Sequence, residues 1–128
     1  MPIFWVYRSG MDATPQIWLN DFDAMAGVGT KGGAFAPDVL NYGPGVAAGN
    51  RYGALSWAAS AGIVAGPGQS LDEYPFASTG QGGPKAWLRV APVAVSEQDI
   101  QREDLRNFYR ANTANFMLAT PFLVVLVP

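Results

Sequence analysis

The residues best suited to chemistry gather in one segment, Leu71–Gly83, which reads LDEYPFASTGQGG. Its two adjacent acids, Asp72 and Glu73, precede an aromatic-proline-aromatic run in which Pro75 favours an extended backbone at Tyr74. Neighbouring side chains of an extended segment point to opposite faces, so one acid can face a site while the other bonds locally. The three glycines at the end of the segment let backbone N–H groups approach a phosphate or another anion closely.

The composition limits the chemistry that this segment can perform. The chain of 128 residues contains no Cys and no His, which excludes disulfides, thiol nucleophiles, cysteine zinc sites and the Ser-His-Asp triad. Catalysis must therefore use carboxylates, amides, hydroxyls, Lys, Arg or a metal held by oxygens. Because the formal net charge is −2, any contact with nucleic acid must depend on a local group of cations.

The acidic segment carries a resemblance to a known family. The run DEYPFAST, residues 72–79, with the Gln-Gly-Gly loop that follows it, resembles the signature of the NucA/NucB bacterial deoxyribonucleases, which include secreted nucleases and toxin domains of polymorphic proteins. The resemblance extends over residues 50–128, through Asn50-Arg51, the strand-like run AWLRVAPV and a helix-like segment with Gln98, Gln101, Arg102, Leu105, Phe108 and Tyr109. The sequence departs from the family pattern at four positions, which are Leu71 in place of a frequent Cys, Gln81, Gln98 and Arg102.

The resemblance implies a metal-dependent endonuclease that hydrolyses DNA phosphodiester bonds. Asp72 and Glu73 would bind a divalent cation, Mg²⁺ or Mn²⁺, and activate water. Gln81 and Gln101 would be further catalytic residues whose amides orient water or bind phosphate. The expected contacts to DNA phosphates are three cations, Arg51, Lys85 and Arg89.

The resemblance also implies partners. DNA would be the substrate. A domain of this kind would act as a bacterial toxin or effector and belong to a larger toxin or delivery system. The cell that produces it would then need a cognate immunity protein.

Two other functions compete with the nuclease. The run Tyr7-Arg8-Ser9, followed by Thr14–Trp18, faintly resembles the first motif of ADP-ribosyltransferase toxins, in which an Arg at a strand end holds the phosphates of NAD. Arg8 would take that role, with Ser60 and Glu97 completing the set. The third possibility is a binding or structural domain on the same scaffold without catalysis, in which Asp72→Ala changes stability but no reaction rate.

These residues must be positioned by a single α+β domain over residues 1–128, with a small, mostly antiparallel sheet and two or three helices on one face. The first 49 residues are expected to supply a strand at Ile3–Tyr7, a helix at Pro15–Met25 and a Gly-rich surface loop at Gly27–Gly49, with a short turn near Pro37–Leu40.

The remaining residues are expected to alternate between helices and extended segments. Asn50 should cap a helix at Arg51–Ala61, with Tyr52, Leu55, Ala58 and Ala59 on one side and Gly62 after its end. Ser96, with Asp99 three residues on, should start a helix to about Tyr109 that turns Leu105, Phe108 and Tyr109 toward the core. The expected extended segments are Leu71–Phe76, a strand at Ala86–Val95 and a buried central strand at Phe122–Val127. Pro92 indicates that the second of these is an edge strand or contains a bulge.

The sequence also bears on location. It has no run of about 18 apolar residues, and its start, MPIFWVYRSG, lacks a basic stretch before an apolar core. We therefore expect no transmembrane helix, no signal peptide and no membrane partner. The protein would be cytoplasmic when produced, and delivered into a target cell or secreted as part of a larger protein.

Overall fold

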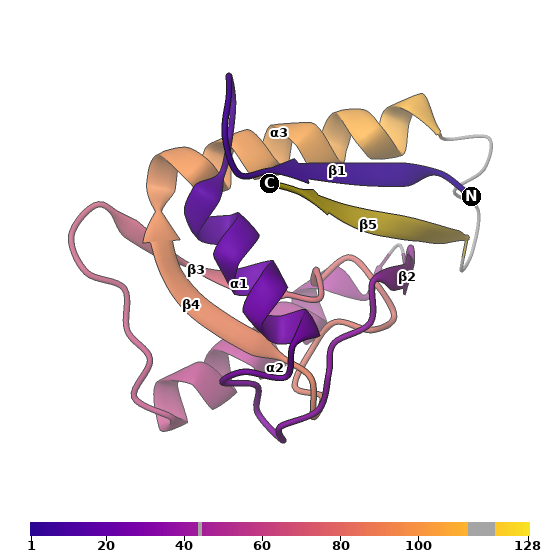
Figure 1. Cartoon of the computed structure of the whole chain (residues 1–128). Helices are drawn as coiled ribbons and strands as arrows, with labels where there is room; N and C mark the ends of the chain where they lie inside the picture. Colours follow the sequence, from indigo (N-terminus) through magenta and orange to yellow (C-terminus); the bar gives the residue numbers. More distant parts are fainter. Residues whose placement is uncertain (44, 113–119) are drawn as a thin grey trace.

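A computed structural model of the chain describes residues 1–43, 45–112 and 120–128. Their order of elements is β1 (Ile3–Tyr7), α1 (Pro15–Met25), β2 (Val39–Asn41), α2 (Ala47–Ser60), β3 (Gln69–Tyr74), β4 (Arg89–Ala94), α3 (Val95–Ala111) and β5 (Pro121–Val127) (Figure 1). The expected α+β class is confirmed. The strands, however, form two small sheets rather than one.

The first sheet is mixed and has the strand order β1-β5-β2. β1 runs parallel to β5, with Ile3 opposite Leu123, and β2 runs antiparallel to it, with Leu40 opposite Phe122. The continuous apolar run of β5 is explained by this central position, as predicted. The surface loop was expected to contain a short turn near Pro37–Leu40. Instead Leu40 lies in β2, is completely buried and holds this part of the loop in the sheet.

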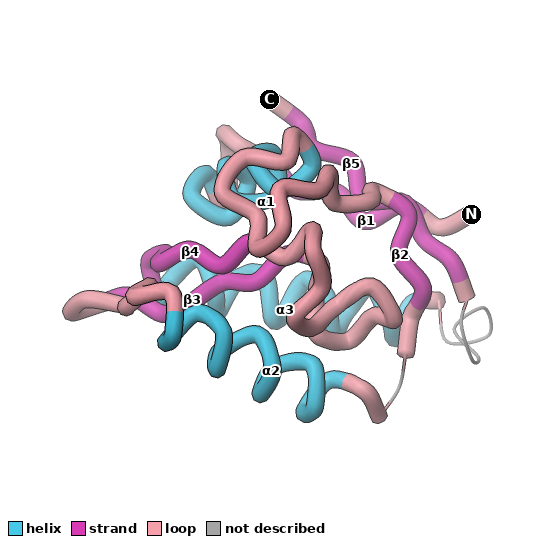
Figure 2. The backbone as a smooth tube through the Cα atoms, turned by 90° about the horizontal axis from the view of Figure 1, so that it is seen from below, coloured by secondary structure: helices cyan, strands magenta, loops and turns pink. Residues whose placement is uncertain are grey.

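The second sheet is a hairpin of β3 and β4 alone, among the described residues. Figure 2 shows this hairpin between α1 on one side and α2 on the other, and both helices contact β4. The hairpin is a sheet separate from the mixed sheet. Among the described residues β4 pairs with β3 alone and is an edge strand, one of the two alternatives that Pro92 indicated, and Pro92 itself is exposed opposite Leu71.

Two apolar cores hold these layers together. The larger core joins the mixed sheet to α1, α3 and the hairpin through residues such as Phe4, Phe122, Ile17 and Tyr74. Leu105, Phe108 and Tyr109 pack against it from α3, as expected. The smaller core lies under α2 and contains Ala54, Ala58, Leu88 and Val90.

The start of α2 differs from the expectation. The helix begins at Ala47, so Asn50 lies in its first turn and does not cap it. The Asn50 amide instead donates to the carbonyl oxygens of Ala77 and Thr79, at 2.9 Å each, and ties α2 to the loop after β3. The buried face of α2 is also shifted, because Ala54 and Ala58 are buried while Tyr52 is exposed.

The start of α3 differs as well. The helix begins at Val95, directly after β4, and Ser96 makes no capping hydrogen bond. The acid of its first turn, Glu97, bonds to another helix: its Oε1 accepts from the backbone N–H groups of Gln16 and Ile17 at 2.9 and 3.1 Å. Glu97 thereby satisfies free N–H groups in the first turn of α1 and fixes α1 to α3.

No helix in the described ranges has the length and apolar character that crossing a membrane requires.

Candidate active site

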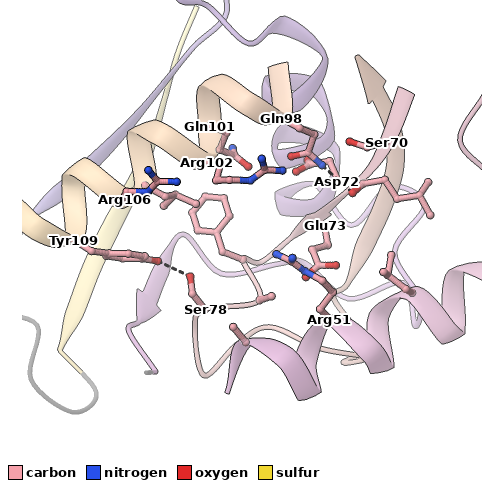
Figure 3. Close-up of a pocket in the computed structure, with 16 residues that line it drawn as sticks. Arg51, Ser70, Asp72, Glu73, Ser78, Gln98, Gln101, Arg102, Arg106 and Tyr109 are labelled. Atoms are coloured by element: carbon pink, nitrogen blue, oxygen red, sulfur yellow. Dashed lines mark hydrogen bonds between the residues drawn. The ribbon is translucent and has the colours of Figure 1, made fainter. Parts of the chain in front are cut away.

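A cavity of about 590 Å³ lies along the free edge of β3, between α2 and α3. Its lining combines Asp72 and Glu73 of β3 with Arg51 of α2 and polar residues of α3, all drawn in Figure 3. Ser78 and Tyr109 border the same cavity, and their hydroxyl oxygens are 2.7 Å apart. The segment that the sequence singled out therefore borders a hollow large enough for a small ligand or a nucleotide.

The position of β3 explains how both acids reach one cavity. They alternate across the strand: Tyr74, on the face of Asp72, packs into the larger core, and Leu71, on the face of Glu73, packs against the smaller one. β3 pairs with β4 on one side only, among the described residues. The cavity borders the other, unpaired side, where residues of both faces line it.

Asp72 is 2% exposed and has one side-chain partner. Its Oδ2 accepts a hydrogen bond of 2.9 Å from Nδ2 of Asn20, on α1. Burial raises the pKa of Asp72 to about 7, and the charges of Glu73 and Glu97 raise it further, whereas the Asn20 bond opposes the shift. A carboxyl group with this pKa exchanges protons near neutral pH, which is common at functional sites.

Glu73 is half-buried, and its Oε1 is a buried atom with no hydrogen-bond partner. Burial raises the pKa of Glu73 to about 6, and the Arg51 guanidinium opposes that shift. Figure 3 shows Arg51 beside Glu73 at the wall of the cavity. A buried acceptor without a partner is costly in a folded protein, and a cation or a donor placed beside this oxygen would offset that cost.

α3 contributes one of its faces to the cavity. Gln98, Arg102 and Arg106 are spaced by four residues and all line it. Gln101, predicted as catalytic, also lines it, and its buried Nε2 has no hydrogen-bond partner. Arg102 and Arg106 were not predicted as site residues, although their spacing from Gln98 is the signal that places them on one helix face.

The lining is locally basic although the whole chain is acidic. It contains three guanidinium groups, of Arg51, Arg102 and Arg106, and two carboxyl groups, of Asp72 and Glu73, within a chain of net charge −2. Arg102 also forms an exposed ion pair of 3.3 Å with Asp99. Acids flanked by arginines can bind a polyanion and still place carboxylates at its reacting group.

The donor set suits a hard divalent cation. The described residues contain no cluster of three or more Asp, Glu, His or Cys side chains. Asp72 and Glu73 nevertheless provide two carboxylates, with the free Oε1 of Glu73, and the amides of Gln98 and Gln101 border the same space. Mg²⁺ is commonly held by one or two carboxylates and keeps several waters, so these residues fit such an ion.

Gln81 lies outside the cavity lining, unlike the expectation. Its Oε1 accepts from the Asn41 backbone N–H, and its Nε2 donates to Asn41 Oδ1, both at 2.7 Å. Its amide therefore anchors the loop to β2 and is not directed at the acids.

The loop glycines also differ from the expectation that their N–H groups bind an anion. The N–H groups of Gly80 and Gly82 already donate to the carbonyl oxygens of Asn41 and Thr79. Gly82 is needed for a close approach of the backbone, because a Cβ there would collide with the Phe76 carbonyl oxygen.

Two of the three predicted phosphate contacts also lie outside the lining. Lys85 Nζ donates to the carbonyl oxygens of Gly80 and Gly82, at 3.2 and 2.7 Å. Arg89 bonds to Asn20 and Val28 and pairs with Asp23 at 3.5 Å. Both cations are used to hold loops and α1 in place, so Arg51 is the predicted phosphate contact that reaches the cavity.

The ADP-ribosyltransferase set is not assembled at this cavity, since none of its three residues lines it. The Arg8 guanidinium stacks over the Trp18 ring at 5.1 Å. Ser60 donates to the Trp57 carbonyl on the exposed side of α2. Glu97 bonds to the first turn of α1.

The chain also matches a known family over this region. A family model described as deoxyribonuclease NucA/NucB matches residues 47–117, which is more than half of the chain. Every residue that lines the cavity lies within this range. No curated protein gives a significant match to the chain.

A second buried acid lies close to Asp72. Asp21 of α1 is completely buried, and neither of its carboxylate oxygens has a hydrogen-bond partner. Burial raises the pKa of Asp21 well above its ordinary value, and the charge of Asp72 raises it further. The protonated form is therefore favoured in the folded state, and its contribution to stability is lost as the pH rises through the folded pKa.

We predict that Asp21→Asn stabilises the protein more at pH 8 than at pH 5. Asn keeps the size of the side chain and removes the charge that must otherwise be buried at high pH. Urea unfolding at both pH values measures the difference. The exposed Asp38→Asn is the control and should change stability equally at both. An equal gain for Asp21→Asn at pH 5 and pH 8 would contradict the prediction.

Proposed function

Because the chain belongs to the family of NucA/NucB deoxyribonucleases, we propose that the cavity beside β3 is its DNA-cleaving site. Membership implies deoxyribonuclease activity with DNA as the substrate. The observation that carries the assignment of the site is the position of Asp72 and Glu73, which line one cavity together with three arginines.

Asp72 and Glu73 would hold a divalent cation, Mg²⁺ or Mn²⁺. When bound, such a cation neutralises charge on the scissile phosphate and lowers the pKa of its water. The two acids are suited to hold it because Asn20 fixes one carboxylate and Glu73 Oε1 has no partner within the protein.

The other side chains of the cavity would bind and orient the substrate. Arg51, Arg102 and Arg106 donate to phosphate oxygens through rigid, permanently charged groups. The buried Nε2 of Gln101 supplies one further donor. Glu73, with a pKa of about 6, is mostly ionised at neutral pH and accepts a proton from the attacking water. The water oxygen then bonds to phosphorus, the ester P–O bond breaks, and the leaving oxygen takes a proton from solvent.

We further propose that this nuclease acts as a toxin inside a target cell, as part of a larger delivered protein, and that a cognate immunity protein protects the producing cell. The absence of Cys supports this, because a fold without disulfides tolerates a reducing compartment. Leu71 stands where secreted members often carry Cys.

We predict that Asp72→Asn and Glu73→Gln each lower the rate of plasmid cleavage by about 100-fold or more. Each change keeps the size of the side chain and removes its charge. The rate is measured on supercoiled plasmid with Mg²⁺, with Mn²⁺ and with EDTA. Glu103→Gln, on the exposed side of α3 and outside the cavity, is the control and should cleave like the wild type.

Two outcomes would contradict this proposal. If Asp72→Asn and Glu73→Gln cleave DNA at the wild-type rate, the two acids take no part in the reaction. A folded wild-type protein that leaves DNA intact with either cation would favour the binding or structural domain without catalysis.

The arginines should contribute to affinity through phosphate contacts. We predict that Arg102→Gln and Arg106→Gln each weaken DNA binding and reduce the slope of log affinity against log salt by about 0.7–0.9. Binding is measured by fluorescence anisotropy in a Glu73→Gln background, so that DNA is not cleaved. The exposed Lys31→Gln should leave the slope unchanged. The prediction is wrong if Arg102→Gln and Arg106→Gln give the same slope as the wild type.

Toxicity has its own test. We predict that induced expression of the wild-type chain in bacteria without an inhibitor stops growth and degrades cellular DNA, whereas Glu73→Gln at equal protein levels does neither. Growth and DNA integrity are followed after induction. Normal growth with a protein that is active on plasmid DNA would contradict the toxin role and leave the nuclease intact.

A further inference from the structure

We propose that Asn20 of α1 is a positioning residue that fixes the orientation of the Asp72 side chain. This inference rests on the proposed function of Asp72. Asn20 does not line the cavity and lies outside the residues that match the family. It acts on the site from the opposite side of β3, through Asp72.

Asn20 donates hydrogen bonds to both the side chain and the backbone of Asp72. Its Nδ2 lies 2.9 Å from Asp72 Oδ2 and 3.3 Å from the Asp72 carbonyl oxygen. Because one amide group donates to two atoms of the same residue, it restrains rotation about the bonds between them. Asn20 is itself only 1% exposed, so water does not replace it easily.

Arg89 determines which end of the amide faces Asp72. Its Nη1 donates to Asn20 Oδ1 at 2.7 Å. A guanidinium group has only donors, so a flipped amide would place an NH₂ group against it and an oxygen against the Asp72 carboxylate. The contact with Arg89 therefore directs the Asn20 donor toward Asp72.

Arg89 is held in turn by two further contacts. Its Nε donates to the Val28 carbonyl oxygen at 2.9 Å, and its Nη2 lies 3.5 Å from Asp23 Oδ2. The result is a continuous series from Asp23 through Arg89 and Asn20 to Asp72. It explains why Arg89, expected to contact phosphate, faces α1 instead.

The consequence for catalysis concerns the two oxygens of Asp72. Oδ2 accepts from Asn20, and the carboxylate also accepts a hydrogen bond from the Glu73 backbone, so these two donors fix how its oxygens are presented to the cavity. Without Asn20, the carboxylate could rotate and present neither oxygen in a fixed place. Misplacement of a reacting group lowers the rate of the chemical step more than the affinity for substrate.

The experiment compares Asn20→Ala with the wild type in steady-state DNA cleavage at saturating Mn²⁺. We expect kcat to fall at least 10-fold while KM changes by less than twofold. Arg89→Gln is the second variant, which leaves Asn20 and Asp72 in place and should lower kcat in the same direction. Ile17→Val, in the buried face of α1, is the matched control for destabilisation and should keep the wild-type kcat.

A crystal structure of each protein gives a readout that does not depend on activity. Asp72 should have one side-chain orientation in the wild type and in Ile17→Val, and a different or divided one in Asn20→Ala. If Asn20→Ala does not fold, the same comparison is made with Arg89→Gln.

The results can contradict either the positioning role of Asn20 or the proposed function of Asp72. An unchanged kcat or an unchanged Asp72 orientation in the folded variants overturns the positioning role. An equal loss of kcat in Ile17→Val also overturns it, because the effect is then general destabilisation. Full activity of Asp72→Asn overturns the proposed function instead, while the crystal structures still decide whether Asn20 orients Asp72.

Discussion

The burial of Asp72 in the middle of β3 is the constraint on which the arrangement of this protein depends. A carboxyl group removed from water must be protonated or given hydrogen-bond donors. The fold supplies the Asn20 amide from α1, and burial still keeps the pKa of Asp72 near 7. Helix α1 must therefore pack against the hairpin with Asn20 beside Asp72, and Glu97 holds the helix by bonding to the N–H groups of its first turn.

This constraint joins the two parts of the chain. The family match covers residues 47–117 and contains every residue that lines the cavity. The residues before it build β1, α1 and β2, and these elements cover the larger core and the inner face of the hairpin. The first 49 residues are thus part of the support of the site, although the sequence resemblance did not explain them.

The differences between the predicted site residues and the residues that line the cavity have a common physical reason. Gln81, Lys85 and Arg89 have the right chemistry for phosphate, but nearby backbone carbonyls and amides bind them first. A polar side chain close to buried backbone groups is needed there, because such groups must be paired. Arg102 and Arg106 were not among the predicted site residues, because the charged face of an amphipathic helix usually points to water. The folded chain instead places part of that face along the cavity.

The sequence by itself determined the local elements and the acidic pair. Aromatic and β-branched residues placed β1 at its observed bounds, and helical spacing with Pro15 did so for α1. The apolar run identified β5 as central, and the DEYPFAST segment singled out Asp72 and Glu73. Tertiary structure alone decided that the strands divide into two sheets. It also decided that Asn50 and Glu97 form hydrogen bonds outside their own helices, and that Asn20 contacts Asp72, 52 residues away. Local preferences depend on neighbours along the chain, whereas these contacts depend on which faces are buried against each other, and one-dimensional patterns do not specify that.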